Sequence, residues 1–256
     1  MKKFILLFLL SISSTAFANN LNSEQQEQVQ HIINLFKKYD IDAISQSISY
    51  PLQRQSPIPS IENAAMMKNR YSQVFDVQLS QTIANSKLSQ WSSVGYRGVM
   101  LDSGLVWLDG PEIRAINYMS PAEQQYKKNI LAQQKQMLHP TLKQFKDVAL
   151  QFKTEKYQVR IDQLSNGNYR YAAWAASKAQ SSKPDLILNN GSVTMDGSGG
   201  NHFYRFKNGT YQYTVYRFIL GAEDIDVELV VEKNSKEILK QAGEILPWVI
   251  LKSRSL

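Results

Sequence analysis

The sequence predicts an α+β fold in which N-terminal helices pack on an antiparallel meander and a C-terminal antiparallel β-rich half ends in a final helix. Apolar residues recur at helical spacing up to about residue 93, and from about residue 156 they alternate with polar residues. Short apolar runs between turn-forming Asp and Gly residues separate these regions. We therefore divide the chain into a leader over 1–18, a helical and three-stranded half over 19–147, and a β-rich half over 148–256.

The leader, MKKFILLFLLSISSTAFA, has the pattern of a secretory signal peptide. Lys2 and Lys3 form its positive start, and residues 4–12 form an apolar core that is too short to span a bilayer as a helix. The run Ala-Phe-Ala predicts cleavage after Ala18. We expect export to the periplasm, with secretion as the alternative, and no transmembrane segment in the mature chain.

The composition is typical of a globular chain without disulfides. The 256 residues are 43% hydrophobic and include no cysteine, so an exported form depends on its core alone. The net charge of +7 is spread along the chain without a polybasic block, and it does not indicate a nucleic-acid partner.

Helical signals dominate the first half. Asn22 and Gln25 form a capping-box pattern, and an apolar stripe follows at Val29, Ile32, Ile33 and Phe36. Shorter helices fit residues 41–48 and 62–75. Three strands are predicted over residues 94–101, 105–108 and 113–118.

A further helix is predicted after Ser120, which stands before a proline and three residues before Glu123. In the second half, turn signals at residues 165–168, 189–191 and 208–209 separate about six alternating strands. The predicted final helix has an apolar stripe made of Ile238, Leu239, Ala242 and Ile245.

The stretch MDGSGGNHFYRF, residues 195–206, is best explained as a sharp turn between two strands. A phosphate cradle would need a helix after the glycines, whereas the residues that follow predict a strand, so we expect no nucleotide or other cofactor. Ser198 and His202 are residue types of a hydrolase, but the serine lacks a nucleophile-elbow motif, and we expect no catalytic residues. The scattered histidines predict no metal site.

Aromatic and basic residues alternate through the second half, so one strand face is expected to present rings and cations to solvent. The leading hypothesis is therefore a soluble, non-catalytic binding protein with a protein or envelope-polymer partner. Inhibitor or immunity roles against an envelope-active enzyme belong to this class. The expected contact surface comprises Asp196, Ser198, Asn201, His202, Arg205, Arg170 and Trp174.

The segments KKYDIDAISQSISYPL and GYRGVMLDSGLVWLDGPEIRAINY resemble, over residues 22–118, the cone-shaped fold shared by nuclear transport factor two, ketosteroid isomerase and scytalone dehydratase. The resemblance implies a sheet curled around a pocket, and hence an alternative function as a small-molecule-binding protein or enzyme. The pocket groups it implies are Tyr50, Tyr96, Arg97 and Trp107. The second half resembles uncharacterised exported bacterial proteins, which imply no activity.

Overall fold

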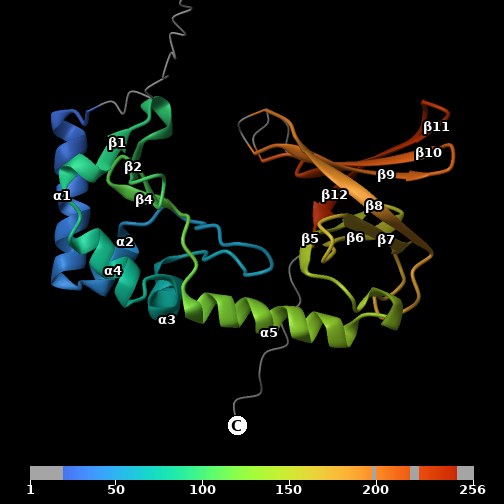
Figure 1. Cartoon of the computed structure of the whole chain (residues 1–256), viewed down its shortest axis with the longest axis horizontal. Helices are drawn as coiled ribbons and strands as arrows, with labels where there is room; N and C mark the ends of the chain where they lie inside the picture. The colour runs from blue at the N-terminus through green and yellow to red at the C-terminus, as the bar shows by residue number, and fades with distance from the viewer. Residues whose placement is uncertain (1–19, 198–199, 220–224, 247–256) are drawn as a thin grey trace, which may run out of the picture. The chain divides into compact units, whose positions relative to one another are not determined.

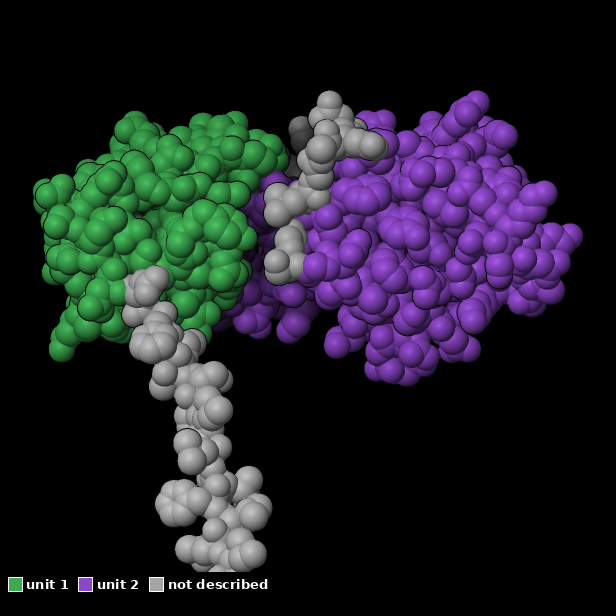
Figure 2. All heavy atoms as spheres, turned by 90° about the horizontal axis from the view of Figure 1, so that it is seen from above, with its two compact units in different colours: residues 1–52, 62–71, 75–118 green, residues 53–61, 72–74, 119–256 purple. Residues whose placement is uncertain are grey.

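Helices and strands both run through the chain, which confirms the predicted mixed α+β class. The computed structural model describes residues 20–197, 200–219 and 225–246 (Figure 1). The chain divides into two units, coloured separately in Figure 2. The N-terminal unit comprises residues 1–52, 62–71 and 75–118, and the C-terminal unit comprises residues 53–61, 72–74 and 119–256.

The helices of the first region begin at polar caps. The capping box before α1 (Ser23–Lys38) is confirmed, because the Asn22 side chain accepts a hydrogen bond from the Gln25 amide at 2.8 Å and the Gln25 side chain accepts one from the Asn22 amide at 3.1 Å. The predicted stripe of α1 is buried. The helices that follow are α2 (Ile41–Gln46), α3 (Ala64–Val74) and α4 (Val77–Ala84).

The predicted meander is present, with one more strand than expected. Its antiparallel order is β1-β2-β3-β4, with strands β1 (Trp91–Ser93), β2 (Val99–Leu101), β3 (Val106–Asp109) and β4 (Glu112–Ile116). A 3-10 turn, η2 (Gly95–Arg97), interrupts the predicted strand 94–101. Gly98 ends this turn at φ 92°, and a Cβ there would lie 2.0 Å from the Leu108 carbonyl oxygen, so the close strand approach requires glycine.

Helix α5 (Pro121–Met137) begins at the predicted N-cap, where Ser120 Oγ accepts a hydrogen bond from the Glu123 amide at 3.0 Å. This helix belongs to the C-terminal unit, whereas the sequence division placed it in the half ending at residue 147. Buried Arg54 donates from Nε to Glu123 Oε1 at 2.9 Å, which ties segment 53–61 to α5. The Ser56 hydroxyl adds a hydrogen bond to the Val148 carbonyl at 2.9 Å.

The C-terminal unit contains a closed antiparallel barrel of eight strands, in the order β10-β11-β12-β5-β6-β7-β8-β9. Its inward side chains form one core, dominated by aromatic and aliphatic residues such as Phe152, Ile161, Tyr171, Phe206 and Leu229. The strands are β5 (Asp147–Thr154), β6 (Tyr157–Gln163), β7 (Tyr169–Ala175), β8 (Leu186–Met195), β9 (His202–Asn208), β10 (Tyr211–Arg217), β11 (Val227–Lys233) and β12 (Lys236–Ile245).

The predicted final helix is wrong, because residues 236–245 form strand β12. The helical spacing of the four apolar residues was misleading, because alternate residues are half-buried from Leu239 to Ile245, while Ile238 and Ala242 lie on the exposed face. Pairing with β11 and β5 gives β12 backbone partners on both edges and closes the barrel. At Gly243 a Cβ would lie 2.9 Å from Phe152 Cδ2, so the absence of a side chain allows the close contact at this seam.

Gly191→Ala tests how tightly the barrel interior is packed. A Cβ at this buried position would lie 2.1 Å from Cε1 of Phe206, whose side chain is itself buried. We expect the free energy of unfolding to fall by about 1–3 kcal/mol, as for other overpacked cores. Urea unfolding followed by circular dichroism measures this change.

Ser192→Ala, at the exposed neighbouring position, is the matched control and should leave the unfolding midpoint nearly unchanged. A second substitution, Phe206→Leu, should make Gly191→Ala less costly than it is alone, because the ring that the methyl meets is gone. Identical midpoints for Gly191→Ala and Ser192→Ala would contradict the described packing.

Candidate functional site

A cavity of about 360 Å³ lies at one end of the barrel. Apolar side chains and tyrosines from β6, β7, β8, β10, β11 and β12 line it. We call it the tyrosine cavity, after Tyr157, Tyr171, Tyr211 and Tyr213. Strand alternation turns these four rings inward, together with the aliphatic core residues below them. Because the strands close on themselves, ring-bearing residues distant in sequence meet at one place.

The four phenol groups of the tyrosine cavity have no hydrogen-bond partner among the residues that the structure describes. The ring centroids of Tyr171 and Tyr213 are 5.7 Å apart, and Tyr171 is only 2% exposed. Burial raises the pKa of Tyr171, and the neighbouring phenols of Tyr213 and Tyr157 raise it further. Burial likewise raises the pKa of Tyr213. Both groups therefore stay protonated at neutral pH and can donate as well as accept hydrogen bonds.

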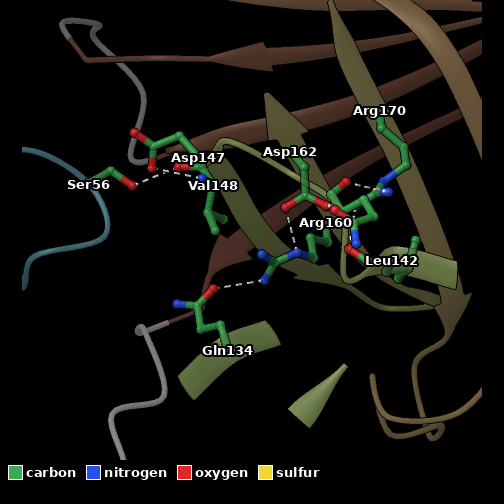
Figure 3. Close-up of polar contacts among 9 residues, drawn as sticks. Ser56, Gln134, Leu142, Asp147, Val148, Arg160, Asp162 and Arg170 are labelled. Atoms are coloured by element: carbon green, nitrogen blue, oxygen red, sulfur yellow. Dashed lines mark hydrogen bonds and ion pairs between the residues drawn. The ribbon is translucent and has the colours of Figure 1, made fainter. Parts of the chain in front are cut away.

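A buried charge cluster occupies the outer face of the barrel wall (Figure 3). The carboxylate of Asp162 accepts from Arg160 Nε at 2.7 Å and from Arg170 Nη2 at 2.6 Å. Arg170 also donates to the backbone carbonyls of Leu142 at 2.7 Å and Gln144 at 3.1 Å. We call Arg160, Asp162 and Arg170 the charge cluster.

Burial shifts the ionisation of the charge cluster. It lowers the pKa of the Arg160 guanidinium, and the adjacent Asp162 carboxylate opposes that shift. It raises the pKa of the Asp162 carboxyl, and both guanidiniums oppose that rise. A second apolar layer that includes Leu142 and Phe145 covers this side of the barrel, which explains why charged residues are buried there.

Arg170 and Trp174 were expected on an exposed contact surface, and that placement is wrong, since they are 5% and 0% exposed. Both point outward from β7, where the covering layer of Leu138, Leu142 and Phe145 removes them from solvent. The Trp174 indole donates to the Ser182 carbonyl at 3.0 Å. Strand alternation correctly predicted that β7 has an inward and an outward face. It could not reveal that the outward face is covered as well as the inward one.

The glycine-rich stretch is the predicted hairpin end between β8 and β9, whose pairing extends to Met195 and His202. Exposed Asp196 donates its amide hydrogen to the Asn201 carbonyl at 2.7 Å, which closes the loop. The half-buried side chain of Asn201 accepts from the Ile219 amide at 2.7 Å. Ser198 lies outside the described residues.

His202 is half-buried, and its Nδ1 lies 2.8 Å from the Gly200 carbonyl oxygen. Beyond it, Arg205 is exposed on the outer face of β9, with its guanidinium carbon 4.8 Å from the centre of the Phe203 ring. That ring lies 5.6 Å from the ring of half-buried Tyr216. A cation and rings thus share an outer face here, and a partner for this face stays a prediction.

The pocket residues implied by the cone-fold resemblance lie on different elements of the N-terminal unit. Tyr96 is 95% exposed and Arg97 is exposed, both on the η2 turn. Tyr50 is half-buried and donates to the Ser45 carbonyl at 2.6 Å, and burial raises the pKa of its phenol to about 12. Trp107 is half-buried on β3.

The tyrosine cavity was not predicted, although its residues were part of the aromatic alternation. The available signal was that tyrosines rather than aliphatic residues stand at inward positions near strand ends, as at Tyr157 and Tyr211. That pattern predicts a cavity only once it is known that the strands form a closed barrel.

Among residues 20–197, 200–219 and 225–246, no group of His, Asp or Glu side chains is arranged to hold a metal ion. In the same described parts, no helix combines the length and apolar character that crossing a membrane requires. Comparison of the chain with protein-family models, with curated proteins and with solved structures gives no match.

Asp162→Asn tests the charge cluster. The substitution leaves two buried guanidiniums without their shared carboxylate, so we expect the free energy of unfolding to fall by about 3–5 kcal/mol. Asp109→Asn is the matched control, because it breaks an ion pair with Arg114 whose side chains are more than half exposed, and it should change stability little. Chemical unfolding at neutral pH compares the two; equal effects would mean that the cluster is solvated.

Proposed function

We propose that this chain is an exported binding protein that holds a small uncharged molecule with an apolar body and hydrogen-bonding groups in the tyrosine cavity. The observation that supports this most is a cavity of about 360 Å³ surrounded by four phenols that have no hydrogen-bond partner in the described part of the chain. The N-terminal signal pattern supports export.

The size and lining of the cavity favour a small ligand. Ligand pockets commonly measure about 300–1,000 Å³, are mostly apolar, and occur in the mouths of barrels. An eight-stranded barrel has room for one small molecule at most. Ala173, Leu229 and Val231 would contact an apolar body, and its burial would supply the main driving force.

The polar groups favour an uncharged ligand. Protonated phenols offer donors and acceptors without a formal charge. Asp185 also lines the cavity, but it is paired with Lys178. The raised pKa values of Tyr171 and Tyr213 make these two tyrosines poor general bases at neutral pH, which supports binding without catalysis. A protein or envelope-polymer partner for the face around Arg205 stays a separate prediction.

Ala173→Leu tests occupancy of the cavity. Its larger side chain would fill space beside Tyr171, so we expect binding of the neutral fluorescent probe N-phenyl-1-naphthylamine to weaken by at least about tenfold. Ala242→Leu makes the same change at an exposed position of β12 and should bind as the unmodified protein does. Circular dichroism confirms folding, and Leu239→Trp at the half-buried rim gives a second obstruction. Equal probe binding by all four proteins would refute the proposal.

Removal of one hydroxyl tests the role of the phenols. Tyr213→Phe should weaken binding of 2-naphthol by about fivefold, the value of one hydrogen bond near 1 kcal/mol, and leave N-phenyl-1-naphthylamine binding unchanged. Tyr216→Phe, on the outer face, should alter neither. Calorimetric titration of 2-naphthol measures the difference, and a Tyr213→Phe protein that binds it normally would show that the hydroxyl is not used.

A further inference from the structure

A second cavity, of about 400 Å³, lies outside the barrel wall in the C-terminal unit. Helix α5 contributes Gln134 and Met137 to its lining, its C-cap residue Leu138 follows, and β6 contributes Gln158 and Arg160. It shares no lining residue with the tyrosine cavity. We call it the arginine cavity. Its walls combine apolar side chains, side-chain amides and one guanidinium.

Two residues that line the arginine cavity, Arg160 and Gln134, each carry a buried donor without an acceptor among the described residues. Arg160 is 1% exposed and uses Nε on Asp162 and Nη1 on Gln134 Oε1, the latter at 3.1 Å (Figure 3). Its Nη2 is buried and has no hydrogen-bond partner among the described residues. The same holds for Nε2 of Gln134, which is 3% exposed. Because Arg160 donates to Oε1, the amide of Gln134 is oriented with its own N–H groups free.

The charge around this cavity is unbalanced. Two guanidiniums, of Arg160 and Arg170, share the single carboxylate of Asp162, which leaves one positive charge in excess within the charge cluster. Backbone carbonyls of Leu142 and Gln144 accept from Arg170, which does not line the cavity. The centre of the Phe145 ring lies 4.8 Å from the guanidinium carbon of Arg160. An aromatic ring attracts a cation but is a weaker hydrogen-bond acceptor than a carboxylate or a carbonyl oxygen. A buried cation with an unused donor favours an anion.

We propose that the arginine cavity binds a small organic carboxylate. One carboxylate oxygen accepts from Arg160 Nη2 and the other from Gln134 Nε2, while the apolar body of the ligand packs on Met137 and Leu138. A single negative charge matches the single positive excess of the charge cluster. The apolar walls favour a carboxylate with a hydrocarbon body over inorganic phosphate, which would bury more charge than the cluster balances.

The test uses benzoate, with benzamide as its uncharged isostere, on the full mature chain. Calorimetric titration should show saturable benzoate binding, and the melting temperature should rise progressively with benzoate concentration, as expected for a ligand that binds only the folded state. Benzamide should bind at least about tenfold more weakly. No binding of benzoate at millimolar concentration, equal binding of benzamide, or tighter binding of inorganic phosphate would each overturn the proposal.

Gln134→Glu places a carboxylate beside Arg160 within the chain itself, so it should neutralise the excess positive charge and replace the Gln134 donor with an acceptor. We expect it to raise the melting temperature without ligand and to weaken benzoate binding at least about tenfold. Gln136→Glu, exposed on the same helix, is the matched control and should bind benzoate normally. Normal benzoate binding by a folded Gln134→Glu protein would refute the assignment.

Ala173→Leu separates the two cavities, because it lines only the tyrosine cavity. It should leave benzoate binding intact, whatever it does to neutral probes. If it removed benzoate binding, benzoate would be located in the barrel and the arginine cavity would lose its support.

Discussion

Closure of the barrel through β12 is the constraint on which the rest of the C-terminal unit depends. The seam is short, with pairing only from Gly243 opposite Thr154 to Ile245 opposite Phe152. It nevertheless gives β5 and β12 partners on edges that would otherwise be open to other chains. Closure also brings strand ends together, so that the tyrosines of β6, β7 and β10 surround one space. The tyrosine cavity is thus a product of topology rather than of any local motif.

A second layer determines the chemistry of the outer wall. Because residues of α5 and of the segment around Leu142 and Phe145 cover β5 to β7, those strands are buried on both faces. Parallel strands in that situation are usually apolar throughout, whereas here the outer face carries Arg160, Asp162 and Arg170. Their mutual pairing offsets part of the desolvation. Of the buried nitrogens left without a partner among the described residues, Arg160 Nη2 and Gln134 Nε2 belong to residues that line the arginine cavity, whereas Arg170 Nε does not.

Short sequence patterns predicted the structural features that depend only on neighbouring residues. The caps at Asn22 and Ser120, the meander turns, and the hairpin pairing that ends at Met195 and His202 depend on a few neighbouring residues, and each is present. Strand β12, barrel closure and the covering of Trp174 depend on contacts between segments far apart in sequence. The same distinction explains why Asp196 was placed correctly on an exposed loop while Arg170 was not.

The two cavities lie on opposite faces of strand β6. On β6, Tyr157 lines the tyrosine cavity, while the next residue, Gln158, and then Arg160 line the arginine cavity. A shift of one residue in the pairing of β6 with β7 would turn Arg160 and Asp162 toward the apolar interior, at a large cost in free energy. The register is therefore fixed by charge as well as by packing. Both cavities depend on this register. It places the uncharged phenols inside the barrel and the charge cluster, with its excess positive charge, on the outer face.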